Sequence, residues 1–193
     1  MLGVGFFKNR IREGQLKKHL IWIDLEMSGL DPETHVILEI GSIVTDNRLE
    51  IIAKGPDIAV NYPEHTLSLM EEWSLKHHQL SGLLDRVKAS PYDCHRAEQD
   101  TIEFLSRYCQ KGESPLCGNS VWQDRRFLAK YMPRLEAFLH YRNIDVSSIK
   151  ELVNRWYPTL PIFTKKKAHL AMSDIEESIK ELAYYREKVF LAS

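Results

Sequence analysis

Three segments near the start of the chain have the pattern of β-strands and follow one another closely. They are 20–27, 36–46 and 49–60, and the last two are rich in Ile and Val. The few residues around Asn47 that separate the second segment from the third have the length of a hairpin connection. The chain is therefore expected to begin its fold with a three-stranded meander.

After residue 60 the pattern changes to helices that alternate with short strands. Apolar residues recur at helical spacing, and Ser90-Pro91 is a helix-start signal. A meander followed by such alternation indicates an α/β domain with a mixed, five-stranded sheet flanked by helices. The expected elements are short helical pieces in 66–80, a helix after Ser90-Pro91, a strand at 114–118, a short helix at 134–140, a strand within 141–149 that turns at Ser147-Ser148, and a helix over about 172–190.

The composition limits the classes of function that need to be considered. With 193 residues the chain has the length of one domain, and 44% of its residues are hydrophobic. The formal net charge is −1, so overall charge does not indicate a protein that coats a nucleic acid. An enzyme that holds a short substrate in a cleft is compatible with this balance.

The first nineteen residues differ from the rest of the chain. They contain five Lys or Arg and one acid, and they lack the long apolar stretch of a secretory signal. Residues 1–19 are interpreted as a basic extension, disordered or weakly helical, before a single domain of residues 20–193; a transit peptide is the alternative.

No apolar run approaches the ~20 residues of a membrane span. Cys94, Cys109 and Cys117 form no C-x-x-C pair, which favours a reducing compartment.

Two acids end the first strand pattern. Asp24 and Glu26 follow the apolar run 20–23, and residues two apart point to the same face of a strand. Two anions that close repel each other unless a lysine, a backbone nest or a metal ion lies between them. A nucleoside triphosphatase would need a G-x-x-x-x-G-K-[ST] loop, and a D-x-D phosphatase would need Asp at position 26; the sequence has neither.

Two further acids and a histidine lie at the ends of expected elements. Asp124 follows a strand, and Ser120 with Gln123 has the S-x-x-Q form of a capping box at the start of the same helix. Asp174 lies near the start of the last helix, and His169 lies on the segment that leads into it. Each acid alone is explained as a first-turn residue that interacts with the helix dipole. Together, the four acids and His169 fit one metal site with a base better than five coincidences.

Such a set of side chains suits the hydrolysis of a phosphodiester. Two divalent ions about 4 Å apart can clamp the attacking and leaving oxygens. Mg²⁺ and Mn²⁺ both prefer carboxylate oxygens as ligands. His169 is the histidine placed beside an acid of the set, so it is the candidate base that deprotonates the attacking water.

The order of these residues resembles a known family. D-x-E at 24 and 26, then Asp124, then H-x-x-x-x-D ending at Asp174 is the order of the DEDDh 3′→5′ exonucleases. The strings WIDLEMSGLDP, CGNSVWQDRRFL, YRNIDVSSIKEL and H-x-A-x-x-D-I-x-x-S-x-x-EL-x-YYR resemble the oligoribonuclease family over about residues 20–190. The resemblance implies a ribonuclease H-like fold, a homodimer in the bacterial cytoplasm, and no stable complex with DNA. It implies hydrolysis of very short RNA, dinucleotides above all, from the 3′ end to 5′-mononucleotides.

The same resemblance assigns roles by position. Two divalent ions, Mg²⁺ or Mn²⁺, would be held by four acids, Asp24, Glu26, Asp124 and Asp174. His169 would act as the base. Seven residues would bind substrate: Leu30 as a wedge between two bases, Trp73 packed nearby, Ser120 and His78 at the 5′ phosphate, and Tyr141, Arg142 and Ser147 reaching that phosphate from the other subunit. Without the resemblance, Leu30 is an ordinary loop leucine, Trp73 a core residue and Arg142 a surface ion-pair partner.

Two other hypotheses remain open from the sequence. A general trimming or proofreading exonuclease would use the same metal site, but it would accept long substrates and give 141–149 no role at the 5′ end. A nucleic-acid-binding module with an inactive site would be expected to lack one of the acids, and all four are present. Lys165–Lys167 could contact RNA phosphates, although a solvated charge run also explains them.

Overall fold

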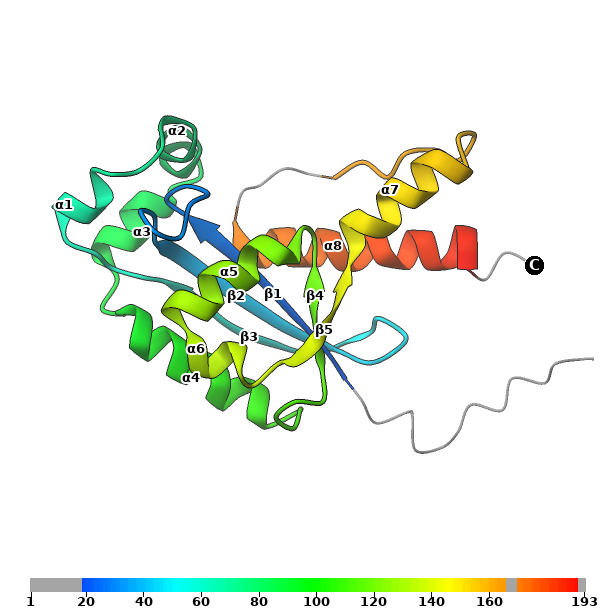
Figure 1. The fold of residues 1–193 in the computed structure, drawn as a ribbon, viewed down its shortest axis with the longest axis horizontal. Helices are drawn as coiled ribbons and strands as arrows, with labels where there is room; N and C mark the ends of the chain where they lie inside the picture. Colours follow the sequence, from blue (N-terminus) through cyan, green and yellow to red (C-terminus); the bar gives the residue numbers. More distant parts are fainter. Residues whose placement is uncertain (1–18, 166–169, 191–193) are drawn as a thin grey trace, which may run out of the picture.

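The computed structural model describes residues 19–165 and 170–190. Its strands are β1 (Leu20–Met27), β2 (Ile37–Thr45), β3 (Ile51–Ala59), β4 (Pro115–Gly118) and β5 (His140–Asp145). These described residues form one mixed five-stranded sheet in the order β3-β2-β1-β4-β5, which confirms the predicted fold class (Figure 1). β1 pairs antiparallel with β2, and β2 with β3, so the meander is confirmed; β4 is parallel to both β1 and β5.

Helices cover both faces of the sheet (Figure 1). They are α1 (Glu64–Leu67), α2 (Glu72–Leu80), α3 (Leu83–Ala89), α4 (Cys94–Ser106), α5 (Val121–Tyr131), α6 (Pro133–Glu136), α7 (Val146–Trp156) and α8 (Ala171–Tyr185), which continues as a π-helical turn, Arg186–Phe190. Residues of α4, α5 and α6 belong to one core cluster, whereas residues of α7 and α8 belong to another. Within residues 19–165 and 170–190, no helix has the length and apolar character needed to cross a membrane.

The alternation of β1 places the acids on the face that carries α7 and α8. Ile23 and Leu25 pack in the cluster with α4, α5 and α6, while Trp22 packs in the other cluster. Asp24 and Glu26 share the face of Trp22 because successive side chains of a strand point to opposite faces. Each fully buried aliphatic side chain stabilises the fold by roughly 1.5–3 kcal/mol. A shift of β1 by one residue relative to its neighbours would move the acids into the apolar cluster and these aliphatic side chains out of it. The register of β1 in the sheet is therefore strongly specified.

The start of α8 lies close to the sheet beside these acids. Gly41 on β2 is the residue opposite Asp24 in the antiparallel pair. A Cβ atom on Gly41 would lie 3.0 Å from Met172 N, which is tighter than normal contact. Glycine at this position therefore allows the first turn of α8, which contains Asp174, to pack against β2.

Three local predictions are wrong. The predicted turn at Ser147-Ser148 lies inside α7, a helix that the sequence analysis did not predict. The helix expected over 134–140 is the shorter α6, because His140 already belongs to β5. Ser120 makes no side-chain capping bond; its φ of 55° places it in the left-handed region instead.

Candidate active site

Three of the predicted carboxylates meet at the end of β1. Asp24 and Glu26 project from β1, and Asp174 lies in the first turn of α8. One carboxylate oxygen of each lies within 4.8 Å of the others. Among the residues that the structure describes, this is the group of acids, histidines or cysteines with the spacing of a metal site. Residues 150 positions apart in the chain, Asp24 and Asp174, therefore form one anionic cluster.

Asp124 reaches the same strand from α5. Its side chain is buried, and Oδ1 accepts a hydrogen bond from Leu25 N at 3.1 Å. β4 pairs with β1 at Ile21 and Trp22 and ends at Gly118. The Leu25 amide, which lies beyond this pairing, is thus bound by the Asp124 carboxylate, and Asp124 lies against the backbone between the two acids of β1.

Burial and mutual repulsion raise the pKa values of these acids. Burial raises the pKa of Asp24 well above its ordinary value, and the charge of Asp124 raises it further. Burial and the charge of Asp174 raise the pKa of Glu26 to about 8. Burial raises the pKa of Asp124 to about 7, although the hydrogen bond from Leu25 acts in the opposite direction. Ionising this cluster near neutral pH therefore costs free energy that a bound cation would offset.

The donor set fits divalent cations such as Mg²⁺ or Mn²⁺. Hard dications prefer carboxylate oxygens, and four acids can balance the charge of two such ions. An Mg–O distance of about 2.1 Å places opposite ligands about 4.2 Å apart. Oxygens within 4.8 Å of one another satisfy that spacing with little rearrangement.

We expect Mg²⁺ and Mn²⁺ to bind more tightly as the pH rises from 6 to 8. Glu26 and Asp124, with pKa values of about 8 and about 7, must lose a proton before binding a cation. Each protonated group weakens the apparent affinity by roughly tenfold per pH unit below its pKa. Calorimetric titration at several pH values, in buffers of different ionisation enthalpy, measures both affinity and proton release. Glu26→Gln should flatten the dependence above pH 7, whereas a pH-independent affinity without proton release would contradict the expectation.

A further acid, which the sequence analysis did not identify, holds the start of α8. Glu39 lies opposite Glu26 on β2 and is fully buried. Its Oε2 accepts a hydrogen bond from Ala171 N at 2.8 Å, and its Oε1 accepts one from the Arg86 guanidinium. Burial raises the pKa of Glu39 to about 7. An acid inside the apolar string VILEI was the available sequence signal for this anchor. The Ala171 amide that Glu39 binds lies three residues before Asp174.

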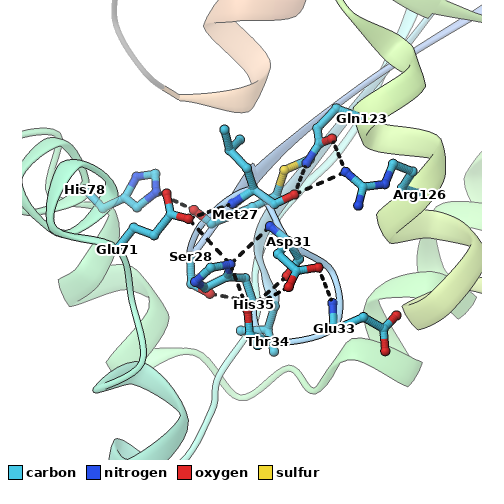
Figure 2. Close-up of polar contacts among 12 residues, drawn as sticks. Met27, Ser28, Asp31, Glu33, Thr34, His35, Glu71, His78, Gln123 and Arg126 are labelled. Carbon is cyan, nitrogen blue, oxygen red and sulfur yellow. Dashed lines mark hydrogen bonds and ion pairs between the residues drawn. The ribbon is translucent and has the colours of Figure 1, made fainter.

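A cavity of about 500 Å³ lies beside the acids, and its lining includes Glu26, Leu30, Trp73 and His78. Leu30 is 64% exposed and Trp73 is 59% exposed, so the interpretation of Trp73 as a core residue is wrong. His78 is buried, with Nε2 2.9 Å from Met27 O (Figure 2) and Nδ1 3.9 Å from Glu26 Oε2. The structure thus brings three of the predicted substrate-binding residues next to a predicted metal ligand.

A second polar group forms where β4 and β5 end. Ser120 N donates to Asp145 Oδ1 at 3.0 Å and to Ser147 Oγ at 3.2 Å, and the two serine hydroxyls lie 3.4 Å apart. These bonds hold Ser120 in its left-handed conformation, which costs about 1–3 kcal/mol for a residue other than glycine. Ser147 thus lies beside Ser120 within one chain, and its approach to the phosphate from a second subunit stays a prediction.

Tyr141 and Arg142 lie outside the cavity of their own chain. Both are exposed on β5, an edge strand of the sheet. The Arg142 guanidinium lies 5.4 Å from the centre of the Tyr141 ring. Neither belongs to the cavity lining, so one chain alone does not bring them to Leu30 and Trp73.

Part of the predicted site lies outside the described residues. This part includes His169, the predicted base, together with Lys166-Lys167, and their roles stay predictions. Residues 1–18 of the basic extension also lie outside the described residues. Lys165 is described, and its Nζ forms an ion pair with the buried Glu181 at 2.7 Å, which corrects its interpretation as a solvated charge.

Comparison with known proteins gives a consistent family. A family model for exonucleases, RNase T, matches residues 21–182. An oligoribonuclease from Dichelobacter nodosus is 55% identical over 175 residues, which cover 91% of this chain and 97% of that protein. An oligoribonuclease from Aliivibrio fischeri is 57% identical over 174 residues, covering 90% of this chain and 96% of that protein.

Solved structures of Exonuclease I share the fold. An apo Exonuclease I has a TM-score of 0.68 at 12% identity, over 90% of this chain and 43% of that one. A zinc-bound E. coli ExoI–ssDNA complex has a TM-score of 0.69 at 13% identity, over 91% and 42%. The chain therefore spans less than half the length of Exonuclease I. By its match to the exonuclease model and by identities above one half over nearly the full length of bacterial relatives, the chain belongs to the oligoribonuclease family of exonucleases.

Proposed function

We propose that this protein hydrolyses very short RNA from the 3′ end, dinucleotides above all, and releases 5′-mononucleotides. The observation that carries the proposal is the cavity of about 500 Å³ that joins the acid Glu26 to the exposed apolar side chains of Leu30 and Trp73. A cavity of this size suits a small ligand rather than a long strand. Exposed apolar and aromatic side chains can pack against bases of any sequence. Membership of the oligoribonuclease family supports the same activity.

The four acids of the site, Asp24, Glu26, Asp124 and Asp174, are proposed to hold two divalent ions, Mg²⁺ or Mn²⁺. When bound, such ions supply Lewis-acid charge at the scissile phosphodiester and favour ionisation of the attacking water. The chain positions the acids from three elements, β1, α5 and α8. Because α5 and α8 each pack on β1, the ligand set forms in the folded chain and not in any single segment.

His169 is proposed to remove the proton from the attacking water. It precedes Ala171, the first residue of α8, by two positions. The Ala171 amide is fixed to the sheet by its hydrogen bond to Glu39 Oε2 at 2.8 Å. A histidine placed next to such an anchor, and five residues before Asp174, suits proton transfer near neutral pH.

A cap at the 5′ phosphate is proposed to produce the preference for dinucleotides. Ser120 and His78 would bind this phosphate from one subunit, and Tyr141, Arg142 and Ser147 would reach it from the other. The position of His78 in the cavity lining supports the first group. The exposure of Tyr141 and Arg142 on an edge strand supports the second, and a guanidinium can make paired hydrogen bonds to a phosphate.

A homodimer in the bacterial cytoplasm is part of this proposal. α7 follows β5 directly and exposes large apolar side chains: Trp156 is 67% exposed, Tyr157, just after it, 45% and Leu152 43%. Several exposed apolar side chains on one helix support a protein interface. The cysteines at 94, 109 and 117 are free, and the relatives named above come from bacteria.

The experiment that tests the proposed function is a time course on 5′-labelled RNA of two, five and twenty nucleotides. Each RNA is incubated with Mg²⁺, with Mn²⁺ and with a chelator. We expect metal-dependent release of 5′-mononucleotides that is fastest for the dinucleotide. Equal or faster cleavage of the 20-mer would retain the metal site but assign the protein to general trimming. No cleavage at any length would leave nucleic-acid binding as the function.

Arg142→Ala is expected to reduce kcat/KM for the dinucleotide by at least about tenfold, and for the 20-mer by less than about twofold. A charged hydrogen-bonding group contributes roughly 1.5–3 kcal/mol, and the 20-mer places its 5′ phosphate far from the cap. Arg107→Ala, a change at an exposed arginine of an ion pair with Glu103, is the matched control. An equal loss on both lengths would refute the cap.

A further inference from the structure

Leu30 presents an exposed apolar side chain from the loop of residues 28–36, which connects β1 to β2. An exposed side chain has few packing contacts, so its position depends on how the backbone beneath it is held. Both backbone polar groups of Leu30 are bound by distant side chains. Leu30 N donates to Glu71 Oε1 at 3.4 Å, whereas Leu30 O accepts from Gln123 Nε2 at 2.5 Å and from Arg126 Nη1 at 3.4 Å.

The orientation of Gln123 is fixed by a second contact. Gln123 is 9% exposed, and its Oε1 accepts a hydrogen bond from Arg126 Nη1 at 2.9 Å (Figure 2). Its Nε2 therefore faces the Leu30 carbonyl. The next residue, Asp124, accepts a hydrogen bond from Leu25 N at 3.1 Å. Two successive residues of α5 thus bind β1 and the loop that follows it. One helix sets the place of a predicted metal ligand and of Leu30.

The remainder of the loop is held by other contacts. Tyr131 Oη, a single hydroxyl donor, lies 2.6 Å from His35 O and 2.9 Å from Pro32 O, both carbonyls of this loop. Gly29 packs on the His35 ring so closely that a Cβ atom there would lie 2.5 Å from it. Removing the Gln123 amide is therefore expected to release the tip of the loop and leave its base in place.

We propose that Gln123 is a positioning residue that fixes Leu30 relative to Asp124 and thereby selects substrates with two adjacent bases. The inference rests on the proposed function and on the predicted role of Leu30 as a wedge between the two bases of a dinucleotide. Arg126 orients the Gln123 amide, and Glu71 holds the opposite side of Leu30. A displacement of about 1 Å in such an arrangement can reduce the rate by roughly a hundredfold.

Two substrates separate this role from a general effect on the site. One is a 5′-phosphorylated dinucleotide; the other is a p-nitrophenyl ester of a 5′-mononucleotide, which has the scissile phosphodiester but no second base. Gln123→Met keeps the length of the side chain and removes the donor. We expect kcat/KM for the dinucleotide to fall by at least about tenfold, mainly through KM, and the ester to change by less than about twofold.

Further variants keep the test sharp. Gln123→Glu retains an acceptor for Arg126 but cannot donate to the Leu30 carbonyl when ionised, so it should give the same selective loss even if Gln123→Met folds poorly. Gln99→Met makes the same change at an exposed helical glutamine of α4 and should leave both substrates unaffected. Leu30→Ala should itself be selective for the dinucleotide. The double variant Leu30→Ala with Gln123→Met should be no worse than Leu30→Ala, because both changes remove one function.

Hydrogen exchange gives a readout that needs no substrate. In Gln123→Met, the amides of residues 29–31 should exchange at least about tenfold faster, with β1 unchanged. Unchanged exchange at the tip, equal losses on both substrates, or additive losses with Leu30→Ala would each overturn the role of Gln123. Failure of the proposed function is a different result, namely a wild-type enzyme without preference for the dinucleotide or a Leu30→Ala variant without selective loss.

Discussion

Asp124→Asn is expected to reduce hydrolysis of a dinucleotide by roughly a thousandfold or more while the fold is retained. A metal ligand contributes several kcal/mol of charge stabilisation in the transition state, which corresponds to a factor of this size. Asparagine preserves an oxygen that can accept the hydrogen bond from Leu25 N, now 3.1 Å from Asp124 Oδ1. It removes the charge, and with it the carboxylate that binds a cation.

The stability of the same variant distinguishes a ligand from a structural residue. Burial raises the pKa of Asp124 to about 7, so its ionised form destabilises the metal-free fold at pH 8. Metal-free Asp124→Asn should therefore melt at the same temperature as the wild type or higher. Asp124→Ala also loses the bond to the Leu25 amide and should be less stable by about 1–3 kcal/mol.

The measurements are kcat/KM for the dinucleotide, the melting temperature in a chelator, and the affinity for Mn²⁺. Asp85→Asn, a neutralised acid on the exposed side of α3, is the matched control and should retain full activity. Activity of Asp124→Asn within tenfold of the wild type at saturating metal would remove Asp124 from the ligand set.

Arg86→Met is expected to destabilise the protein by about 2 kcal/mol at pH 8 and by less at pH 5.5. Removing one partner of a buried ion pair typically costs about 3–5 kcal/mol, and the Arg86 side chain is 38% exposed, which lowers the figure. Arg86 pairs with the fully buried Glu39 and, at 3.3 Å, with Asp57 Oδ1. Without the guanidinium, the ionised Glu39 carboxylate would be a buried anion that has lost its cationic partner.

The sign of the pH dependence follows from Glu39. Its pKa is already raised to about 7 by burial even though Arg86 lowers it, so the variant pKa should be higher still. At pH 5.5 Glu39 is largely protonated in both proteins and the difference is small. As the pH rises through the folded pKa, the variant loses stability that the wild type keeps.

Urea denaturation in a chelator at pH 5.5 and pH 8 measures the effect of Arg86→Met. Arg107→Met breaks the exposed pair with Glu103 and should change stability by less than about 0.5 kcal/mol. Because Glu39 also holds Ala171 N, Arg86→Met should lower dinucleotide hydrolysis as well. A loss of stability that is equal at both pH values would contradict this account of Glu39.

Much of the sheet and of the acid cluster could be predicted from local sequence. Apolar runs with short connections define the meander, and the period of two places Asp24 and Glu26 on one face, because alternation acts between residues two positions apart. The amphipathic helix α7 could also have been predicted, since Val146, Ile149 and Val153 have helical spacing. Serines at 147 and 148 favoured a turn instead, because serine is common in turns.

The tertiary structure decided how these local elements cooperate. Glu39 binds Arg86, 47 residues away, and Gln123 binds the Leu30 carbonyl, 93 residues away. Ser120 adopts a left-handed conformation because Asp145 and Ser147 hold its amide, not because serine favours it. The sequence by itself determined which strand carries the paired acids, since that depends on neighbours along the chain. The packing of α5 and α8 against β1 and β2 decided which other side chains bind and orient the elements that carry these acids. Such contacts form between residues that are distant in the sequence, so no local pattern predicts them.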